Sequence, residues 1–200
     1  YKRQGPRGAG AIDITKSLTE NIKNVAAKMN RNVDEITLVM LDRERHHGLM
    51  KEARDLGARI MLISDGDVNP AMECCIEGSG VHMVVGTGGA PEGVLAAAAL
   101  KCVGGDMQAR LKPETEEEIR RCHEMGITDV NQVLTLDDLV RTDDVIFAAT
   151  AITRGNLLNA IQYFPGGART HTIVMRSKTG TVRFLDTVHM DEKLKSLKAK

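Results

Sequence analysis

The chain has 200 residues, of which 42% are apolar, so it is long enough to bury one good hydrophobic core and we expect it to be globular. Lysine plus arginine and aspartate plus glutamate each total 27, which leaves no net field for a nucleic-acid backbone and argues against nucleic acid as a partner. Aromatic residues make up only 2% of the chain and tryptophan is absent, which removes any case for base-stacking platforms.

The sequence shows no pattern typical of a membrane helix, a signal peptide, a disulfide framework or a zinc site. No apolar run approaches the roughly 20 residues that a membrane helix needs, and the start lacks a signal-peptide pattern, so we expect no membrane partner and a cytoplasmic location. The cysteines have neither zinc-site nor disulfide spacing, so we expect reduced structural thiols at Cys74, Cys75, Cys102 and Cys122. Because the first residue is Tyr1 and not methionine, we interpret the chain as part of a longer protein.

The first predicted elements form a strand–helix–strand unit preceded by a helix. A capping box over residues 17–20, followed by apolar residues at helical spacing, predicts an amphipathic helix at 17–30. An apolar run predicts a strand at 36–41, and helical spacing over 49–56 leads to a second strand at 60–63. Because a helix connects these two strands, we expect them to pair in parallel.

A third strand and two more helices follow. A short helix at 69–77 is expected to end at Gly78, before an apolar strand at 81–85. An alanine-rich helix at 92–103 then closes at Gly104. Three strands that each end in a charged or glycine-rich loop indicate an open α/β sheet, with its ligand beyond the carboxyl ends of the strands.

The second half of the chain changes in kind. Pro113 is expected to open a charged, solvated helix over 114–124. The patterns further on predict a strand at 144–150, a helix at 156–161, and an antiparallel hairpin formed by 172–176 and 181–188. We expect residues 190–200 to be a frayed, lysine-rich tail. With no internal repeat and no clear linker, residues 1–200 are assigned to a single domain.

The glycine-rich loop at residues 86–93 is the most informative feature of the sequence. A glycine-rich strand-to-helix turn lets the backbone approach a ligand and offers N–H groups to an anion such as phosphate. Glu92 would repel that anion unless a hard cation lay between them, which favours a metal-assisted phosphate site with Glu92 as a ligand. The alternative is that Glu92 simply complements the helix dipole as a first-turn acid.

A second loop follows the strand at 60–63. It contains Asp65, Gly66 and Asp67, and two carboxylates that flank a glycine can accept hydrogen bonds from sugar hydroxyls or hold a cation. The alternative is an ordinary turn, because Asp-Gly is a common turn dipeptide.

A third loop follows the strand at 36–41. It contains Arg43, Glu44, Arg45 and His46. The two arginines alternate along an extended segment, so we expect one of them to grip a phosphate while the other, or His46, supports it. The alternative is a solvated loop end.

Six longer motifs carry a family resemblance. They are LDRERH at 41–46, ISDGDV at 63–68, GGAPEGVLAAA at 88–98, GDMQARL at 105–111, RCHEMGI at 121–127 and IFAAT at 146–150. In this order, and over nearly everything from residue 5 to residue 189, the chain resembles the class II fructose-1,6-bisphosphatases, which in some organisms also act on sedoheptulose 1,7-bisphosphate. Residues 1–4 look foreign to that family.

The resemblance implies a fold and a reaction. The implied fold is the layered αβαβα sugar phosphatase fold of the lithium-sensitive phosphatase superfamily, of which this chain would be the C-terminal part, with parallel strands and a terminal β-hairpin. The implied reaction is hydrolysis of the 1-phosphate of fructose 1,6-bisphosphate to fructose 6-phosphate and inorganic phosphate, in gluconeogenesis. It also implies Mn²⁺ or Mg²⁺ as cofactor and a homo-oligomer, either a dimer or a tetramer.

The resemblance also implies roles for the residues of the three loops. A metal ligand is implied at Glu92, a backbone contact to substrate at Gly89, a hold on the sugar at Asp65, Gly66 and Asp67, and contact with the phosphorylated end of the substrate at Arg43, Glu44 and Arg45. The sequence departs from the family, which usually has proline at the position of Glu44, isoleucine at that of Thr87 and glycine at that of Ala151.

In the family, most metal-binding carboxylates and the segment that positions the attacking water lie in an N-terminal half that these residues do not contain. We therefore expect no catalytic residue in this chain, weak substrate binding and no turnover by the chain alone. The alternative function is a nucleotide- or sugar-phosphate-binding module without catalysis, although the chain lacks the GxGxxG spacing of dinucleotide sites. A non-catalytic role in regulation or assembly is a third possibility.

Overall fold

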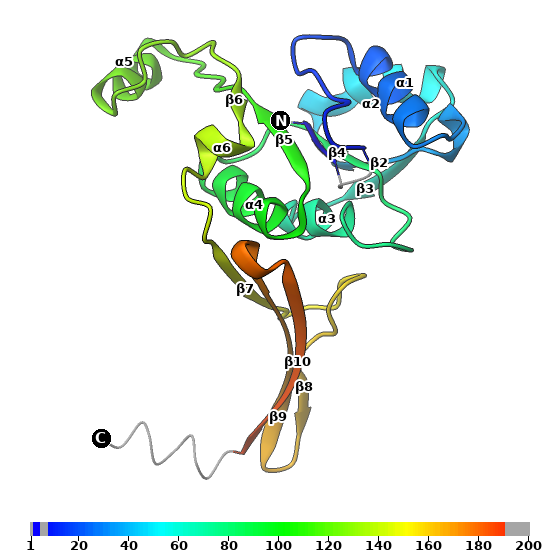
Figure 1. Cartoon of the computed structure of the whole chain (residues 1–200), viewed down its shortest axis with the longest axis vertical. Helices are drawn as coiled ribbons and strands as arrows, with labels where there is room; N and C mark the ends of the chain where they lie inside the picture. Colours follow the sequence, from blue (N-terminus) through cyan, green and yellow to red (C-terminus); the bar gives the residue numbers. More distant parts are fainter. Residues whose placement is uncertain (1, 5–7, 191–200) are drawn as a thin grey trace.

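Two β-sheets alternate with two layers of helices in the computed structural model, which describes residues 2–4 and 8–190 (Figure 1). The order of the layers is helices, the first sheet, helices and the second sheet. This arrangement confirms an α/β architecture with parallel strands and a terminal hairpin.

The first sheet has six strands in the order β3-β2-β4-β1-β5-β6. Their bounds are β1 Lys2–Gln4, β2 Thr37–Leu41, β3 Arg59–Ile63, β4 Met83–Val85, β5 Asp106–Ala109 and β6 Leu134–Thr135. Strand β2 pairs in parallel with both β3 and β4, as expected for strands joined through helices. Strand β1 runs antiparallel between β4 and β5, and β6 pairs antiparallel with β5.

Helices α1 (Leu18–Lys28) and α2 (His47–Asp55) cover one face of this sheet. The predicted capping box at the start of α1 is present, because the Ser17 hydroxyl accepts from the Glu20 amide and the Glu20 carboxylate accepts from the Ser17 amide. The apolar stripe of α1 includes Ile22, which is completely buried. Burial of such a side chain contributes about 1.5–3 kcal/mol relative to leaving it exposed.

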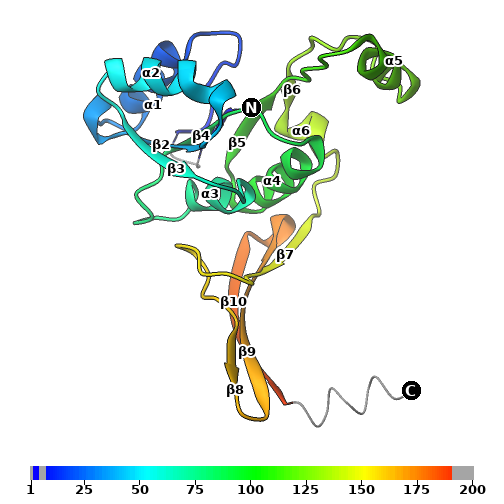
Figure 2. The ribbon, with the colours of Figure 1, turned by 180° about the vertical axis from the view of Figure 1, so that it is seen from behind.

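Helices α3 (Val68–Glu73) and α4 (Ala90–Val103) lie between the two sheets (Figure 2). On one side, alanines and Leu100 of α4 pack with Met107 of the first sheet. On the other side, Ala99 of α4 packs with Phe147 and Ile173 of the second sheet. A helix with neighbours on two sides is apolar around most of its surface, which explains the alanine run that the sequence showed.

The second sheet has the strand order β10-β9-β7, with β8 paired to β9. Its strands are β7 Ile146–Thr150, β8 Gln162–Phe164, β9 Gly167–Arg176 and β10 Thr181–Met190. The predicted hairpin is confirmed and is longer than expected, because β9 and β10 pair over ten residues each. Gly180 turns the chain with φ of +59°, a conformation that favours glycine. The hairpin extends well beyond the helices (Figures 1 and 2).

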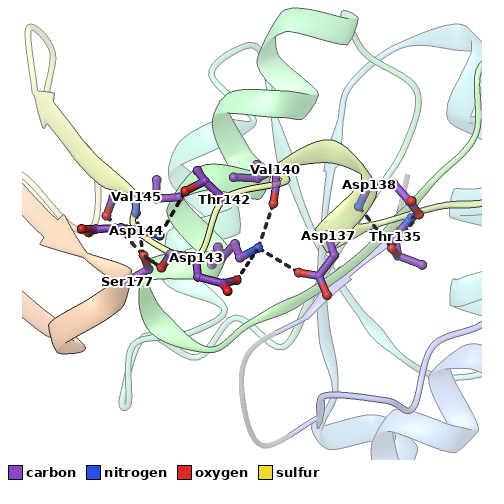
Figure 3. Close-up of polar contacts among 10 residues, drawn as sticks. Thr135, Asp137, Asp138, Val140, Thr142, Asp143, Asp144, Val145 and Ser177 are labelled. Carbon is purple, nitrogen blue, oxygen red and sulfur yellow. Dashed lines mark hydrogen bonds and ion pairs between the residues drawn. The ribbon is translucent and has the colours of Figure 1, made fainter.

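The connection between the sheets is fastened by Lys101, near the end of α4. Its ammonium donates to Asp137 Oδ1 at 2.9 Å and to the Val140 carbonyl at 2.8 Å, and lies 3.6 Å from Asp143 Oδ1 (Figure 3). Val140 follows helix α6 (Leu136–Leu139), and Asp143 lies shortly before β7. One side chain thus anchors the segment that leaves the first sheet and enters the second.

Several predicted boundaries are shifted. Helix α3 ends at Glu73, four residues before the predicted end at residue 77, and α4 begins at Ala90, so Glu92 lies inside its first turn. Helix α5 (Glu116–Glu124) begins two residues later than predicted, because the Thr115 hydroxyl accepts from the Glu118 amide and caps it. The prediction that α5 is a solvated helix is confirmed, since it contributes no buried residue.

The predicted helix at residues 156–161 is wrong. The segment forms an irregular loop whose polar groups bond outward, since the Asn159 amide donates to His171 Nδ1 and the Asn156 side chain donates to Glu73. The Ile161 amide donates to the Ile152 carbonyl across the base of the loop. In a helix the amides of Asn159 and Ile161 would have bonded to the preceding turn, and here both have other partners.

Five strands and helices were not predicted, namely β1, β5, β6, α6 and β8, and the sequence did not show that β7 belongs to a second sheet. Residues 191–200 of the predicted frayed tail lie outside the described residues, while Met190 is the last residue of β10. The single-domain assignment and the foreign origin of residues 1–4 stay predictions. No helix in the described part of the chain is long and apolar enough to span a bilayer.

Candidate functional site

The three loops that the sequence singled out lie side by side. They follow the carboxyl ends of β2, β3 and β4, which are neighbours in the sheet with β2 in the middle. The loop after β2 therefore reaches both of the others. This is the edge at which open α/β sheets bind their ligands.

Both arginines of the β2 loop hold the backbone of a neighbouring loop. Arg43 Nη2 donates to the Ser64 carbonyl at 2.7 Å, in the loop after β3. Arg45 donates from Nε at 3.3 Å and from Nη2 at 2.8 Å to the Thr87 carbonyl, in the loop after β4. A guanidinium has five N–H donors, so these exposed side chains keep donors for an anion. Glu44 between them is exposed at the start of a 3₁₀ turn, Glu44–His46.

His46 lies beneath the glycine loop and is 1% exposed. Its Nδ1 lies 2.8 Å from the Leu41 carbonyl, and its Nε2 accepts from the Thr87 amide at 2.9 Å. The sequence left His46 as a possible support for a phosphate-binding arginine. The structure instead places it against the backbone of Gly86 and Thr87.

The glycine loop becomes exposed where α4 begins. Gly88 and Gly89 are exposed, and their amides donate no hydrogen bond to any described residue. The exposed Glu92 side chain folds back over Gly89, where a Cβ atom would overlap the carboxylate. Free amides at a helix N-terminus attract an anion, and the adjacent Glu92 carboxylate favours a cation.

The two aspartates of the β3 loop differ in environment. Asp65 is exposed and its Oδ1 accepts from the Gly66 amide at 2.8 Å, while Gly66 has φ of +80°. Asp67 is 6% exposed and stands at the N-terminus of α3. In this arrangement Asp65 can meet a ligand in solution, whereas Asp67 is buried.

A cavity of about 790 Å³ opens beside Asp65 and Gly66, between α3 and the loop at 151–158. This volume is within the range of roughly 300–1,000 Å³ that is typical of ligand pockets. In its wall, Glu73 accepts from Asn69 Nδ2 at 3.0 Å and from Asn156 Nδ2 at 3.3 Å.

Burial raises the pKa of the Glu73 carboxyl, and the hydrogen bond from Asn156 opposes that shift. Sequence reasoning missed this cluster. Glu73 looked like an ordinary helical residue, and Asn156 lies 83 positions away in the chain.

Metal-ligating side chains do not cluster in the part of the chain that the structure describes. No group of three or more His, Cys, Asp or Glu side chains there could hold a metal ion. Glu92 can supply one oxygen ligand of the kind that Mg²⁺ and Mn²⁺ prefer.

Sequence comparison decides the family. The family described as "Bacterial fructose-1,6-bisphosphatase, glpX-encoded" matches residues 4–189. The chain belongs to this family of fructose-1,6-bisphosphatases. Two relatives, from Crocosphaera subtropica and Synechococcus elongatus, are named "D-fructose 1,6-bisphosphatase class 2/sedoheptulose 1,7-bisphosphatase". Each is 43% identical to the chain, over 98% and 96% of its length respectively.

The matches cover 60% and 59% of these two fructose-1,6-bisphosphatase relatives, so the chain spans less than two thirds of their length. The resemblance inferred from the six motifs is confirmed by this family membership. The individual residue roles stay predictions. One departure has a physical explanation, since Arg45 and His46 both bind the backbone of Thr87, and neither contact depends on whether its side chain is threonine or isoleucine.

Proposed function

We propose that this chain carries the substrate-binding part of a metal-dependent sugar bisphosphatase. The reaction is hydrolysis of the 1-phosphate of fructose 1,6-bisphosphate, and sedoheptulose 1,7-bisphosphate is a second candidate substrate because both activities appear in the names of the relatives. The observation that carries the proposal is that Arg43, Arg45 and His46 join the three loops of the family motifs into one surface.

The residues of this surface bind and orient the substrate. The free amides of Gly88 and Gly89 suit phosphoryl oxygens, and the remaining donors of Arg43 and Arg45 suit the phosphate at the other end of the sugar. The exposed Asp65 carboxylate can accept from a sugar hydroxyl. Contacts remote from the reacting phosphate fix its position, which lowers the entropic part of the barrier.

Glu92 is the residue of this chain that would hold a divalent metal, Mn²⁺ or Mg²⁺. When bound, such a metal offsets negative charge on the transferring phosphoryl group and lowers the pKa of a coordinated water. One carboxylate is too few for a stable site, so the other ligands must come from the part of the enzyme that this chain does not span. The chain alone should therefore bind substrate weakly and release no phosphate.

We further propose that the layered αβαβα fold is completed on the outer face of the second sheet. Ile146 and Leu185 on this face are 68% and 43% exposed, which is unusual for apolar residues in a finished sheet face. A further helical layer would cover them. In the complete protein we expect a cytoplasmic homo-oligomer, either a dimer or a tetramer.

The chain can be tested by joining it to the missing part of a family relative and measuring phosphate release from fructose 1,6-bisphosphate with Mn²⁺. We expect activity that Glu92→Gln lowers by a factor of at least about 100, the effect of weakening a metal that acts on the transition state. Glu114→Gln is the matched control, because the Glu114 side chain is 75% exposed and lies outside the three loops, and this variant should keep full activity.

A well-folded chimera without activity, or one that Glu92→Gln leaves unaffected, would contradict the proposed reaction. In that case a binding module without catalysis is the remaining function. A rise in melting temperature with ATP or NAD, but not with fructose 1,6-bisphosphate, would then identify the ligand as a nucleotide.

A further inference from the structure

His46 connects two loops of the site without reaching the surface on which a ligand would lie. It stands at the end of the β2 loop, is almost completely buried, and meets the glycine loop through the Thr87 amide. Its neighbour Arg45 binds the Thr87 carbonyl. Both polar groups of the Thr87 backbone are therefore fixed by two consecutive side chains of the neighbouring loop.

The two ring contacts define the tautomer of His46. Nε2 accepts the hydrogen of the Thr87 amide, so this nitrogen carries no proton of its own. The proton lies on Nδ1, which donates to the Leu41 carbonyl at 2.8 Å. The ring is thus attached at one nitrogen to the end of strand β2 and at the other to the glycine loop, and it cannot rotate without losing a buried hydrogen bond.

Gly86 shows how closely the ring is fitted to the loop. A Cβ atom at this position would lie 3.0 Å from Cε1 and 3.2 Å from Nε2 of His46. Both nitrogens of the ring are held, so the ring cannot move aside as a flexible side chain would. Gly86 is buried against the ring, and its lack of a side chain is what permits the approach.

A glycine-rich loop needs such an attachment to be ready for a ligand. Fixing one residue costs roughly 1–2 kcal/mol of conformational entropy, and glycine loses more freedom than other residues. If this ordering happened only on binding, it would weaken the affinity for the ligand. With Thr87 held on both sides, the adjacent amides of Gly88 and Gly89 stay exposed and in place.

We infer that His46 is a positioning residue that holds the glycine loop in its ligand-ready shape and does not itself touch the substrate. The claim that the loop binds a sugar phosphate rests on the proposed function, whereas the attachment of Thr87 to His46 does not. The two parts can therefore fail separately.

The attachment is tested by nitrogen NMR and amide hydrogen exchange on the 200-residue chain. In the unaltered protein, the His46 spectrum should show a protonated Nδ1, an unprotonated Nε2 and a coupling across the hydrogen bond to the Thr87 amide. In His46→Phe, which keeps a ring of similar size, exchange at Thr87 should rise about tenfold or more, while the amides of β2 and β4 keep their protection.

His46→Gln offers one acceptor and one donor and should restore part of the protection. His47→Gln is the matched control, because His47 is the exposed neighbour of His46, and it should leave exchange at Thr87 unchanged. The same variants are titrated with fructose 1,6-bisphosphate, and we expect affinity to fall in His46→Phe and to be kept in His47→Gln.

A protonated Nε2 in the unaltered protein, or unchanged Thr87 exchange in a folded His46→Phe, would overturn the inference. If His46→Phe does not fold, the protonation of the two His46 ring nitrogens in the unaltered protein decides whether the inference holds. If Thr87 loosens as expected but no form of the chain binds the bisphosphate, the positioning role stands and the proposed function fails.

Discussion

At the scale of single residues, Glu73 is the most buried carboxyl group in the part of the chain that the structure describes. It is 3% exposed, and burial raises its pKa above the ordinary value of 4.5. A raised carboxyl pKa means that the folded protein keeps a proton that the unfolded chain has already lost. The free energy of unfolding should therefore fall as the pH rises from about 4.5 through the pKa of the folded state.

The replacement Glu73→Gln removes this titration and should flatten that part of the pH profile. Asn69 can turn its side-chain oxygen toward the new amide, so the packing is kept. The test is urea unfolding of both proteins from pH 4 to pH 8, with the unaltered protein losing stability relative to the variant as the pH rises. Two profiles that run parallel over this range would show that Glu73 ionises as readily in the folded protein as in the unfolded chain.

At the scale of elements, the sequence predicted structure correctly where short-range patterns determine it. The capping box of α1, the parallel pair of β2 and β3, and the β9–β10 hairpin all follow from short-range patterns, and all are present. Strand β6 has two residues and exists because β5 lies beside it, which no local pattern shows.

The predicted helix at 156–161 failed for the same physical reason. Its helical pattern was overridden by other partners, since the Asn159 amide donates to His171 and the Ile161 amide donates to the Ile152 carbonyl. In the candidate site, the loops could be predicted because they follow recognisable strands. The burial of Asp67 and the attachment of His46 to Thr87 could not, because both depend on how the elements pack.

Lys101 gives an element-scale prediction. Its side chain is 12% exposed and its ammonium holds Asp137, the Val140 carbonyl and Asp143. In Lys101→Met, the segment from α6 to the start of β7 loses this anchor, so amide exchange over residues 136–145 should rise.

Exchange in β2 and β4 should stay the same in Lys101→Met, since β1 and β5 separate both strands from β6, which leads into the anchored segment. Lys112→Met is the control, because the Lys112 side chain is 62% exposed and has a single ion pair at 3.9 Å. Equal exchange over residues 136–145 in the Lys101 variant and in the control would refute the role of Lys101 as an anchor.

At the scale of the whole molecule, the chain has an exposed apolar surface on its second sheet. Ile146 and Leu185 on the outer face are 68% and 43% exposed, and Val174 of β9 lies on the same face. Such a surface tends to associate in water. We expect the isolated chain to self-associate as its concentration rises, and Ile146→Thr combined with Leu185→Thr to shift it toward monomer.

Sedimentation over a range of concentrations measures this association. Met125→Thr is the control, because Met125 is 70% exposed but lies just after α5, far from the second sheet (Figure 1). A chain that stays monomeric at every concentration, or one that the control shifts equally, would contradict the assignment of the outer face as the associating surface.

The central claim is that the three loops at the ends of β2, β3 and β4 form one sugar bisphosphate site. The most direct measurement is an NMR titration of the chain with fructose 1,6-bisphosphate, with ATP as the competing ligand. We predict chemical-shift changes concentrated at Gly88, Gly89, Asp65 and the side-chain nitrogens of Arg45. The binding should be weak but saturable, and ATP should not cause these changes. Shifts that fall outside these loops, or that ATP reproduces, would contradict the claim.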